Sequence, residues 1–370
     1  MPWTDLVVFS HLRWAFVWQR PQHLISRLAA DQPTFFVEEP IADPDVQAPT
    51  LRWAQNGAVT QVWLAMPGPD RHYDFDDPAA AGYADLLREF LGPARHRAAW
   101  IYTPVATALA SAVEPSYVVY DVMDDLASFK DAPRSLREQQ DVLLAGADIV
   151  FAGGRSLHQG ILDRRPDAHC FPSGVETEHY LPARAARRRG ARPVAGYVGV
   201  IDERLDLELI GGLASALPDW DVEVVGPVVK IDPVDLPVAP NLRYPGSRRY
   251  DELPAVMAAF DVALMPFARN DATRSISPTK TLEYMAAGLP VVSTSVPDVV
   301  ADYSDVVCIA DDVEEFAAGC RQASAMDALE LDRLTWPTLR RQHWDSIVVR
   351  MTALTRRPRV LDLAAVEESV

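Results

Sequence analysis

The sequence predicts an α/β protein with two domains, each built on a parallel β-sheet covered by helices. The length of 370 residues suits two domains. Short apolar runs alternate with helical patterns along most of the chain. Such alternation is typical of right-handed βαβ units whose strands are buried on both faces. A basic stretch flanked by Pro182 and Pro193 interrupts the pattern. We therefore place the domains at 1–185 and 186–335.

The apolar runs set the expected order of elements. The expected strands are Leu6–Phe9, Thr34–Val37, Val59–Ala65, Ala98–Tyr102, Tyr117–Val122 and Ile149–Ala152, then Val194–Val200, Val222–Val225, Val262–Met265, Val291–Ser293 and Val306–Ile309. The expected helices are Gln22–Ala30, Ala80–Phe90, Ser135–Leu144, Leu207–Leu217, Asp251–Ala259 and Thr279–Ala287. Beyond them, apolar residues at helical spacing predict one more helix over 336–355, which we expect to pack back on the first domain.

Composition excludes several classes of protein. Acidic residues number 52 against 35 basic ones, a net charge of −17, which argues against binding a nucleic-acid backbone. The three cysteines form no CxxC pair, so we expect a reducing compartment. Neither a signal peptide nor an apolar run long enough to span a membrane is visible. We expect a cytoplasmic protein. The dense basic stretch Arg184–Arg192, which we interpret as a solvated linker, leaves peripheral contact with the inner face of a membrane open.

The segment Ser277–Thr294 is the most informative part of the chain. Ser277 suits a helix N-cap, and Pro278 suits the first helical position. Gly288 suits the end of the helix, and Pro290 prevents its continuation. The plain structural alternative is a capped helix between two strands that binds no ligand.

Three polar side chains of this helix indicate a nucleotide site. Thr279, Lys280 and Glu283 lie at spacing i, i+1 and i+4, so they share one face. The amide groups of a first helical turn and a lysine attract an anion. A carboxylate one turn later can accept hydrogen bonds from ribose hydroxyls. The pattern suits a nucleoside diphosphate.

The first strand of the second domain leads into a second phosphate-binding candidate. Gly199 lies near the end of this strand and permits close approach of a phosphate, and Arg204 could bind that phosphate with two nitrogens. Ligand sites in open parallel sheets form at the carboxyl ends of strands. The alternative is a structural ion pair between Arg204 and Asp202 or Asp206.

A cluster of aromatic and charged residues follows the first strand of the chain. Trp14 and Trp18 offer faces for sugar rings, and Arg13 and Arg20 suit a phosphate or carboxylate of an acceptor. His11 in the same cluster is a candidate catalytic residue. Alternatively this is a packed loop with both tryptophans in the core.

Two further candidate catalytic residues follow the run Tyr117–Val122. Asp121 and Asp124 would lie at the carboxyl end of that strand, where one could take a proton from an acceptor hydroxyl. Their spacing gives no metal-binding pattern, so no metal ligand is predicted. The alternative is capping of the next helix by Asp124 or Asp125.

The segment Ser277–Thr294 resembles the donor-site helix of GT-B-fold glycosyltransferases of the retaining, family-four type (glycosyl transferases group 1), whose pattern ends in Glu-x-Met-Ala-x-Gly-x-Pro-Val-Val. The resemblance implies two Rossmann-like domains that face each other across a cleft. It also implies that Glu283 binds ribose and that the first domain binds the acceptor. Ser275 stands where many members have a second glutamate. The N-terminal cluster resembles a subgroup tied to teichuronic acid and other cell-surface polysaccharides.

The resemblance implies an enzyme that transfers a sugar, with retention, from a nucleotide-sugar donor to a saccharide or lipid-linked acceptor. UDP is the default nucleotide, and neither a cofactor nor a metal is expected. Two alternatives stay open. Ser275 would also fit a scaffold that binds the donor without turnover, and a sugar-nucleotide epimerase can share this fold.

Overall fold

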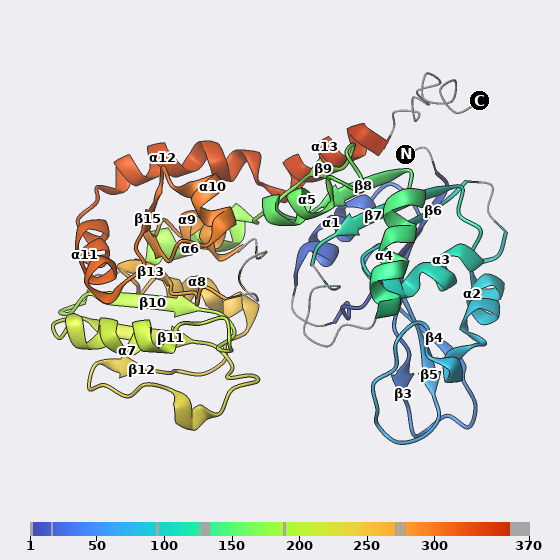
Figure 1. Ribbon diagram of the computed structural model, residues 1–370, viewed down its shortest axis with the longest axis horizontal. Helices are drawn as coiled ribbons and strands as arrows, with labels where there is room; N and C mark the ends of the chain where they lie inside the picture. The colour runs from blue at the N-terminus through green and yellow to red at the C-terminus, as the bar shows by residue number, and fades with distance from the viewer. Residues whose placement is uncertain are drawn as a thin grey trace. The chain divides into compact units, whose positions relative to one another are not determined.

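The computed structural model describes residues 3–15, 18–93, 96–124, 126, 134–187, 190–270, 273, 276 and 279–355. The chain divides into two compact units (Figure 1). The first comprises Met1–Phe151, Ile161–His169 and Ile347–Val370, and the second comprises Ala152–Gly160 and Cys170–Ser346. Each unit is organised around a β-sheet of mainly parallel strands.

The first unit contains a doubly wound sheet with strand order β3-β5-β2-β1-β6-β7-β8-β9. β1 pairs in parallel with β2 and with β6, so the chain changes direction across the sheet between β1 and β6. Only β4, which pairs with β5, is antiparallel among the described pairs. The strands are β1 (Asp5–Ser10), β2 (Thr34–Glu38), β3 (Ile41–Ala42), β4 (Thr50–Asn56), β5 (Val59–Met66), β6 (Arg97–Ile101), β7 (Tyr117–Val122), β8 (Ile149–Ala152) and β9 (His169–Cys170).

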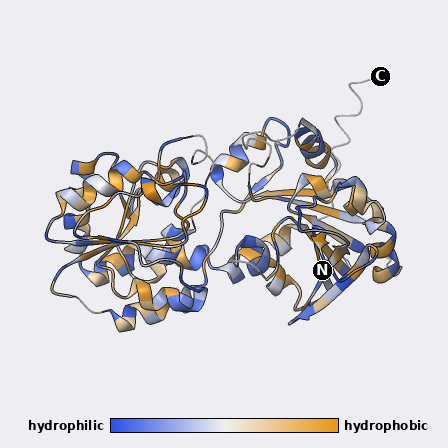
Figure 2. Cartoon of the chain, turned by 90° about the horizontal axis from the view of Figure 1, so that it is seen from below, coloured by the Kyte–Doolittle hydropathy of each residue, from blue (hydrophilic) through white to orange (hydrophobic). Residues whose placement is uncertain are grey.

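Central strands of this sheet form the core of the first unit. Every residue of β1 and of β6 is buried, and the strands are largely apolar in Figure 2. Trp100 stacks on Phe151 with ring centroids 5.8 Å apart. The helices of this unit are α1 (Arg20–Leu28), α2 (Tyr83–Leu91), α3 (Thr107–Ala112) and α4 (Arg134–Gly146), with short 3-10 turns at Pro78–Ala80 and Pro104–Ala106. α5 (Arg155–Ile161), which follows β8, belongs to the second unit up to Gly160.

The second unit contains a sheet of parallel strands in the order β12-β11-β10-β13-β14-β15. This is the strand order of a Rossmann sheet, in which the change of direction falls between β10 and β13. The strands are β10 (Val194–Val198), β11 (Asp221–Val225), β12 (Leu242–Arg243), β13 (Val262–Met265), β14 (Val291–Ser293) and β15 (Val307–Ile309).

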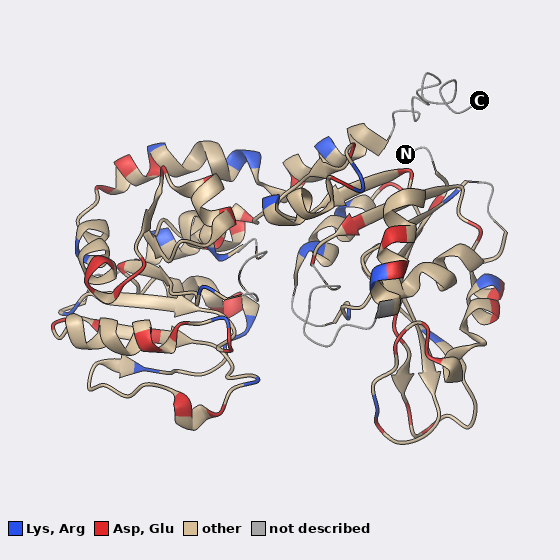
Figure 3. Ribbon diagram, viewed as in Figure 1, with Lys and Arg blue, Asp and Glu red and all other residues tan. Residues whose placement is uncertain are grey.

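Helices connect these strands and supply the outer charges of the second unit. Figure 3 shows acidic and basic residues on α12, whereas β10 carries neither. The helices are α6 (Thr177–Ala186), α7 (Leu207–Ala216), α8 (Leu253–Met257), α9 (Lys280–Ala286), α10 (Pro297–Tyr303), α11 (Val313–Ser324), α12 (Ala328–Arg341) and α13 (Trp344–Thr355), with 3-10 turns at Pro233–Asp235 and Tyr250–Glu252.

Every apolar run expected as a strand lies on a strand of the structure. The short strands β3, β9 and β12 were not predicted, nor was β4, whose side chains are mostly exposed or half-buried. The single helix expected over 336–355 is two helices, α12 and α13. They separate because the carbonyl of Gln342 and the amide of Trp344 form hydrogen bonds with the backbone of Val175. These two groups are therefore not available for hydrogen bonds within a continuous helix.

The units do not divide at position 185. α6, which spans that position, lies in the second unit because it packs against α8 and α9. The residues of α13 from Ile347 on group with the first unit.

The interpretation of the basic stretch as a solvated linker is wrong for three of its arginines. Arg184 and Arg187 donate to backbone carbonyls at the end of α9. Arg192 donates to the carbonyls of Pro218 and Trp220, each at 2.7 Å. These guanidinium groups therefore stabilise the second unit.

Within the described residues, no helix combines the length and apolar character needed to cross a membrane.

The tightest packing in the second sheet predicts a stability effect. A Cβ atom added to Gly196 of β10 would lie 2.3 Å from the Phe260 ring. We expect Gly196→Ala to lower the free energy of unfolding by about 1–3 kcal/mol, because both groups sit in a filled core. Urea unfolding measures the change. Gly160→Ala in α5, where nothing lies within 4 Å, is the matched control and should cause no loss. Equal stability of both variants would contradict this packing.

Candidate nucleotide-binding site

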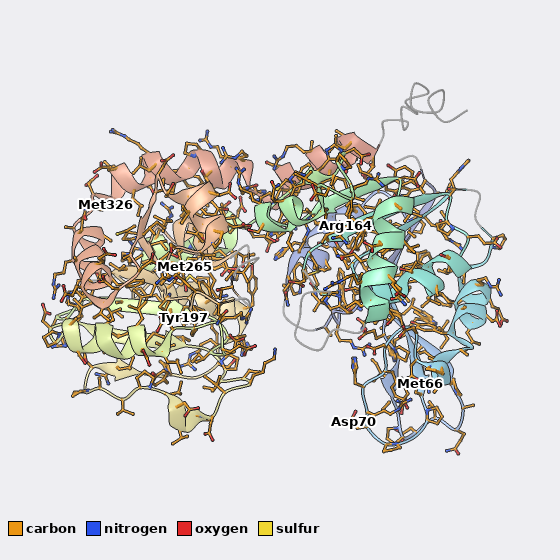
Figure 4. The ribbon with its side chains drawn as sticks, viewed as in Figure 1. Met66, Asp70, Arg164, Tyr197, Met265 and Met326 are labelled. Carbon is orange, nitrogen blue, oxygen red and sulfur yellow. The ribbon has the colours of Figure 1, made fainter. Side chains whose placement is uncertain are left out.

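The candidate site lies where β10 and β13 end. The loops that follow these strands pair with each other through an antiparallel bridge between Leu205 and Phe267. The amide of Asp206 donates to the carbonyl of Pro266 at 2.9 Å, and the amide of Ala268 donates to the carbonyl of Arg204 at 2.8 Å. Tyr197 in β10 and Met265 at the end of β13 are labelled in Figure 4. Open parallel sheets bind ligands at this position.

Gly199 occupies a crowded position directly after β10. A Cβ atom on Gly199 would lie 2.2 Å from Cε and 2.9 Å from Nζ of Lys280. On another side, a Cβ atom on Gly226 would lie 1.7 Å from the carbonyl oxygen of Gly199. Both positions therefore require glycine, and the Lys280 side chain extends over the backbone of Gly199. Two predicted donor-site residues far apart in sequence are in close contact.

Charged groups of both signs surround the Lys280 ammonium group. Burial lowers the pKa of Lys280, and the negative charge of Glu283 opposes this shift. Arg204 also lowers the pKa of Lys280, whereas Asp202 raises it. The structure thus brings together Gly199, Arg204, Lys280 and Glu283, four of the six residues predicted to bind a donor.

Arg204 forms the ion pair that the structural alternative predicted. Its Nε lies 2.9 and 3.0 Å from the two carboxylate oxygens of Asp202, and its Nη2 lies 2.6 Å from one of them. Asp202 is buried, whereas the Arg204 side chain is 41% exposed. Asp206 instead caps α7 by accepting from the amide of Leu209. Asp202 therefore fixes Arg204 while part of the Arg204 side chain stays accessible to solvent.

Tyrosine side chains next to Glu283 were missed by the sequence reasoning. Burial raises the pKa of Tyr180, and the charge of Glu283 is the next cause. Burial and then Glu176 and Glu283 raise the pKa of Tyr250. His179 stacks on Tyr250 with ring centroids 3.8 Å apart. Nothing in the spacing of Tyr180 and Tyr250 along the sequence indicates that both are influenced by Glu283.

Arginines hold the far end of the donor helix α9. Arg184 donates to the carbonyls of Met285 and Ala286, each at 2.7 Å. Arg187 donates to the carbonyls of Ala287 at 3.1 Å and Gly288 at 2.7 Å. Cationic groups stabilise the carbonyl end of a helix. This contact fixes α9 and therefore Lys280 and Glu283.

The start of the donor helix is described only in part. Thr279 is half-buried and directly precedes α9. The predicted N-cap Ser277, with Pro278 and Ser275, lies outside the described residues. The roles assigned to Ser277 and Thr279 therefore stay predictions.

In the first unit, Arg20 and Asp121 form a buried ion pair. Arg20 Nε lies 3.1 and 3.0 Å from the two carboxylate oxygens of Asp121, and Nη2 lies 2.9 Å from one of them. Their side chains are 2% and 0% exposed. Breaking such a pair leaves an unpaired buried charge. The contacts favour a structural role for both residues over the acceptor and catalytic roles predicted for them.

Arg13 is also held by the protein itself. Its guanidinium lies 3.4 Å from the carboxylate of Glu38 and donates to the carbonyls of Glu39 and Pro40. Glu38, which is fully buried, also accepts from the amide of Trp14 at 2.6 Å. Burial, followed by the charge of Asp74, raises the pKa of Glu39 to about 8. Sequence analysis did not single out either glutamate, because an acidic pair after a strand has no distinctive spacing.

Trp14 and Trp18 differ in exposure. Trp14 is 7% exposed and packs edge-on against Phe36, which matches the packed-loop alternative. Trp18 is 41% exposed and packs edge-on against His23. Both border a pocket of about 490 Å³, which is also lined by Ala15, Ser26, Asn56, Gly57, Ala58 and Val59. The pocket combines aromatic faces with few polar groups.

The other two candidate catalytic residues differ in their surroundings. His11 follows β1, and its Nδ1 is buried with no hydrogen-bond partner among the described residues. Burial lowers the pKa of His11 to about 4, so its imidazole is neutral near pH 7. Asp124 is exposed after β7, and Asp125 lies outside the described residues. Their catalytic roles stay predictions.

Residues 193–325 match the family described as Glycosyl transferases group 1. The second unit therefore contains a domain of this glycosyltransferase family, as the resemblance of Ser277–Thr294 predicted. A Bacillus subtilis (strain 168) protein named for teichuronic acid biosynthesis, the glycosyltransferase TuaH, is 26% identical over 219 residues. That alignment covers 54% of this chain and 55% of the relative, or about half the length of each.

Solved structures with a similar fold are GT-B glycosyltransferases. Sucrose-phosphate synthase from Thermosynechococcus elongatus has a TM-score of 0.67 at 14% identity, with 95% of this chain and 98% of that chain covered. The E. coli protein described as bound with UDP-2-fluoro glucose gives 0.68 at 12% identity, with 96% and 100% covered. Anabaena Alr3699/HepE, described in complex with UDP and glucose, gives 0.67 at 14% identity, with 95% and 99% covered. The predicted GT-B fold class is confirmed.

The half-buried His11 predicts a loss of stability in acid. Its folded-state pKa of about 4 lies below the ordinary 6.5. The unfolded chain therefore gains a proton first as the pH falls, and stability present above pH 6.5 is lost toward pH 4. The loss amounts to at most about 3.4 kcal/mol.

We expect His11→Gln to flatten this dependence in urea unfolding measured between pH 7 and 4.5. The exposed His96→Gln variant is the control and should retain the wild-type dependence. Identical pH profiles for wild type and His11→Gln would show that His11 is not the group responsible.

Proposed function

We propose that this protein is a retaining glycosyltransferase that transfers a sugar from a UDP-sugar to a saccharide or lipid-linked acceptor in cell-surface polysaccharide or glycoconjugate synthesis. The observation that carries the proposal is the contact of Lys280 with Gly199 beside Arg204 and Glu283, at the carboxyl ends of β10 and β13. The matched family domain supports the reaction class. The similar structures described with UDP ligands support the nucleotide. The relative named for teichuronic acid biosynthesis supports the acceptor class.

Lys280 and Arg204 would bind the diphosphate of the donor. In the transfer, the bond between the anomeric carbon and the β-phosphate oxygen breaks, and the acceptor oxygen forms a new bond to that carbon while losing its proton. Negative charge then increases on the departing UDP. Fixed cations next to that charge stabilise the transition state, the role that a metal has in other enzymes. Glu283 would accept hydrogen bonds from the ribose hydroxyls.

The first unit would bind the acceptor through Trp18. This side chain keeps 41% of its surface exposed and borders the 490 Å³ pocket together with Ser26 and Asn56. An aromatic face with a few polar neighbours suits a sugar ring. Arg13 and Arg20 are held by internal partners, so they are not part of this proposal.

Donor binding tests the proposal directly. We expect Lys280→Met and Glu283→Gln each to weaken binding of UDP and UDP-glucose at least about tenfold in calorimetry, since each loses a charged contact with the ligand. Glu208→Gln on the exposed side of α7 is the matched control and should bind as wild type does. ADP- and GDP-sugars in the same titrations test the choice of base. Absence of UDP binding to wild type, or equal binding by wild type and all variants, would contradict the proposed donor site.

Two alternative functions predict different results when the protein is incubated with a UDP-sugar and a panel of acceptors. Tight donor binding without product across an acceptor panel would indicate a scaffold that has lost catalysis. Conversion of the UDP-sugar into an isomer without any acceptor would indicate an epimerase. Mass detection of released UDP and of sugar products separates these outcomes from transfer.

The acceptor site makes its own prediction. We expect Trp18→Ala to raise the acceptor KM about 3- to 10-fold, the worth of one aromatic contact, while Trp18→Phe keeps most of the affinity. Donor affinity should not change. UDP release from UDP-glucose with a panel of mono- and disaccharides provides the measurement. Trp53→Ala is the control, because Trp53 is 58% exposed and does not line the pocket. An unchanged KM in Trp18→Ala would contradict the assignment.

A further inference from the structure

A second group of polar side chains lies in the first unit, at the end of β2. Glu39 directly follows this strand, and His72 and Asp74 belong to the segment after β5. An antiparallel bridge between Ile41 and His72 holds that segment beside β3. One ligand atom from each of Glu39, His72 and Asp74 lies within 4.8 Å of the other two. None of these residues belongs to the proposed donor or acceptor site.

Glu39 is the unusual member of this group. Its side chain is buried, with the residue 6% exposed, yet its carboxylate accepts no hydrogen bond from the described part of the chain. Only its backbone carbonyl has a partner, the guanidinium of Arg13. A largely buried carboxylate is costly to ionise unless a cation pairs with it. The same carboxylate lies within reach of His72 and Asp74, which are both exposed to solvent and open to an entering ion.

The surrounding charges do not neutralise Glu39. Asp74, Asp76 and Glu38 are all negative groups that act on it, and Arg13 is the cation that opposes them. Arg13 itself lies 3.4 Å from the carboxylate of Glu38. His72 Nε2 lies 2.9 Å from a carboxylate oxygen of Asp74, and the imidazole would be a neutral ligand once a metal binds. The cluster thus retains excess negative charge next to a buried carboxylate.

We propose that Glu39, His72 and Asp74 bind one divalent transition-metal cation. Two carboxylates and one imidazole are ligands that Zn²⁺ and Mn²⁺ accept, whereas an imidazole disfavours Mg²⁺. The ion would supply the positive charge that Glu39 lacks and would fasten the segment carrying His72 and Asp74 to the end of β2. Three protein ligands leave a coordination position for water.

The test uses the full chain, freed of any affinity tag and treated with chelator. Calorimetric titration with ZnCl₂ and MnCl₂ should show one ion bound per chain, and MgCl₂ should bind more weakly. Glu39→Gln and His72→Ala should each weaken binding at least about tenfold, because losing even an outer partner of a metal ligand costs that much. His72 is 71% exposed, so its replacement leaves the core intact. Asp70→Asn is the matched control, an exposed acid close by in the chain that is labelled in Figure 4.

Melting temperature gives an independent measurement. A cation at about 100 times its dissociation constant should raise the wild-type melting temperature by several degrees, and this rise should vanish in both ligand variants. Absence of binding by wild type, or equal binding by wild type and both variants, would overturn the proposal. It would also be overturned if Glu39→Gln raised the melting temperature while no cation bound, because a proton on Glu39 would then be the neutralising partner.

Discussion

The close packing around Gly199 is the constraint on which the candidate donor site depends. The carbonyl of Gly199 lies against Gly226 after β11, and Lys280 of α9 crosses its other side. Three segments that follow different strands therefore meet at one residue without a side chain. This contact places the ammonium group of Lys280 over the end of β10. α9 can hold that position because Arg184 and Arg187 bind the carbonyls at its far end.

The candidate site contains two cationic side chains, Arg204 and Lys280, each next to a carboxylate of the protein. Asp202 is buried and directs Arg204, whose side chain keeps 41% exposure. Burial weakens the proton affinity of Lys280, and Glu283 partly restores it. A diphosphate would add negative charge close to both cations and so favour their charged forms. Glu283 in turn raises the pKa of the buried hydroxyls of Tyr180 and Tyr250.

The first unit uses its arginines differently. Arg20 and Arg13 are bound to Asp121 and to the Glu38–Pro40 segment, where they stabilise the carboxyl edge of the sheet rather than offer charge to a ligand. Trp18 and the neutral His11 are left as the groups of the N-terminal cluster that suit an acceptor. The acidic excess at Glu39 remains outside that arrangement.

The sequence alone predicted the α/β class and the strands with continuous apolar runs, and it singled out Lys280 and Glu283 on α9. It could do so because burial on both faces and helix spacing are local properties of the chain. It did not indicate the exposed strand β4, the break between α12 and α13, or the internal partners of Arg20 and Arg184. Those features depend on which residues meet after folding. Only the tertiary structure decided that Lys280 lies on Gly199 and that Glu39 lies beside His72, because no local pattern encodes contacts between distant segments.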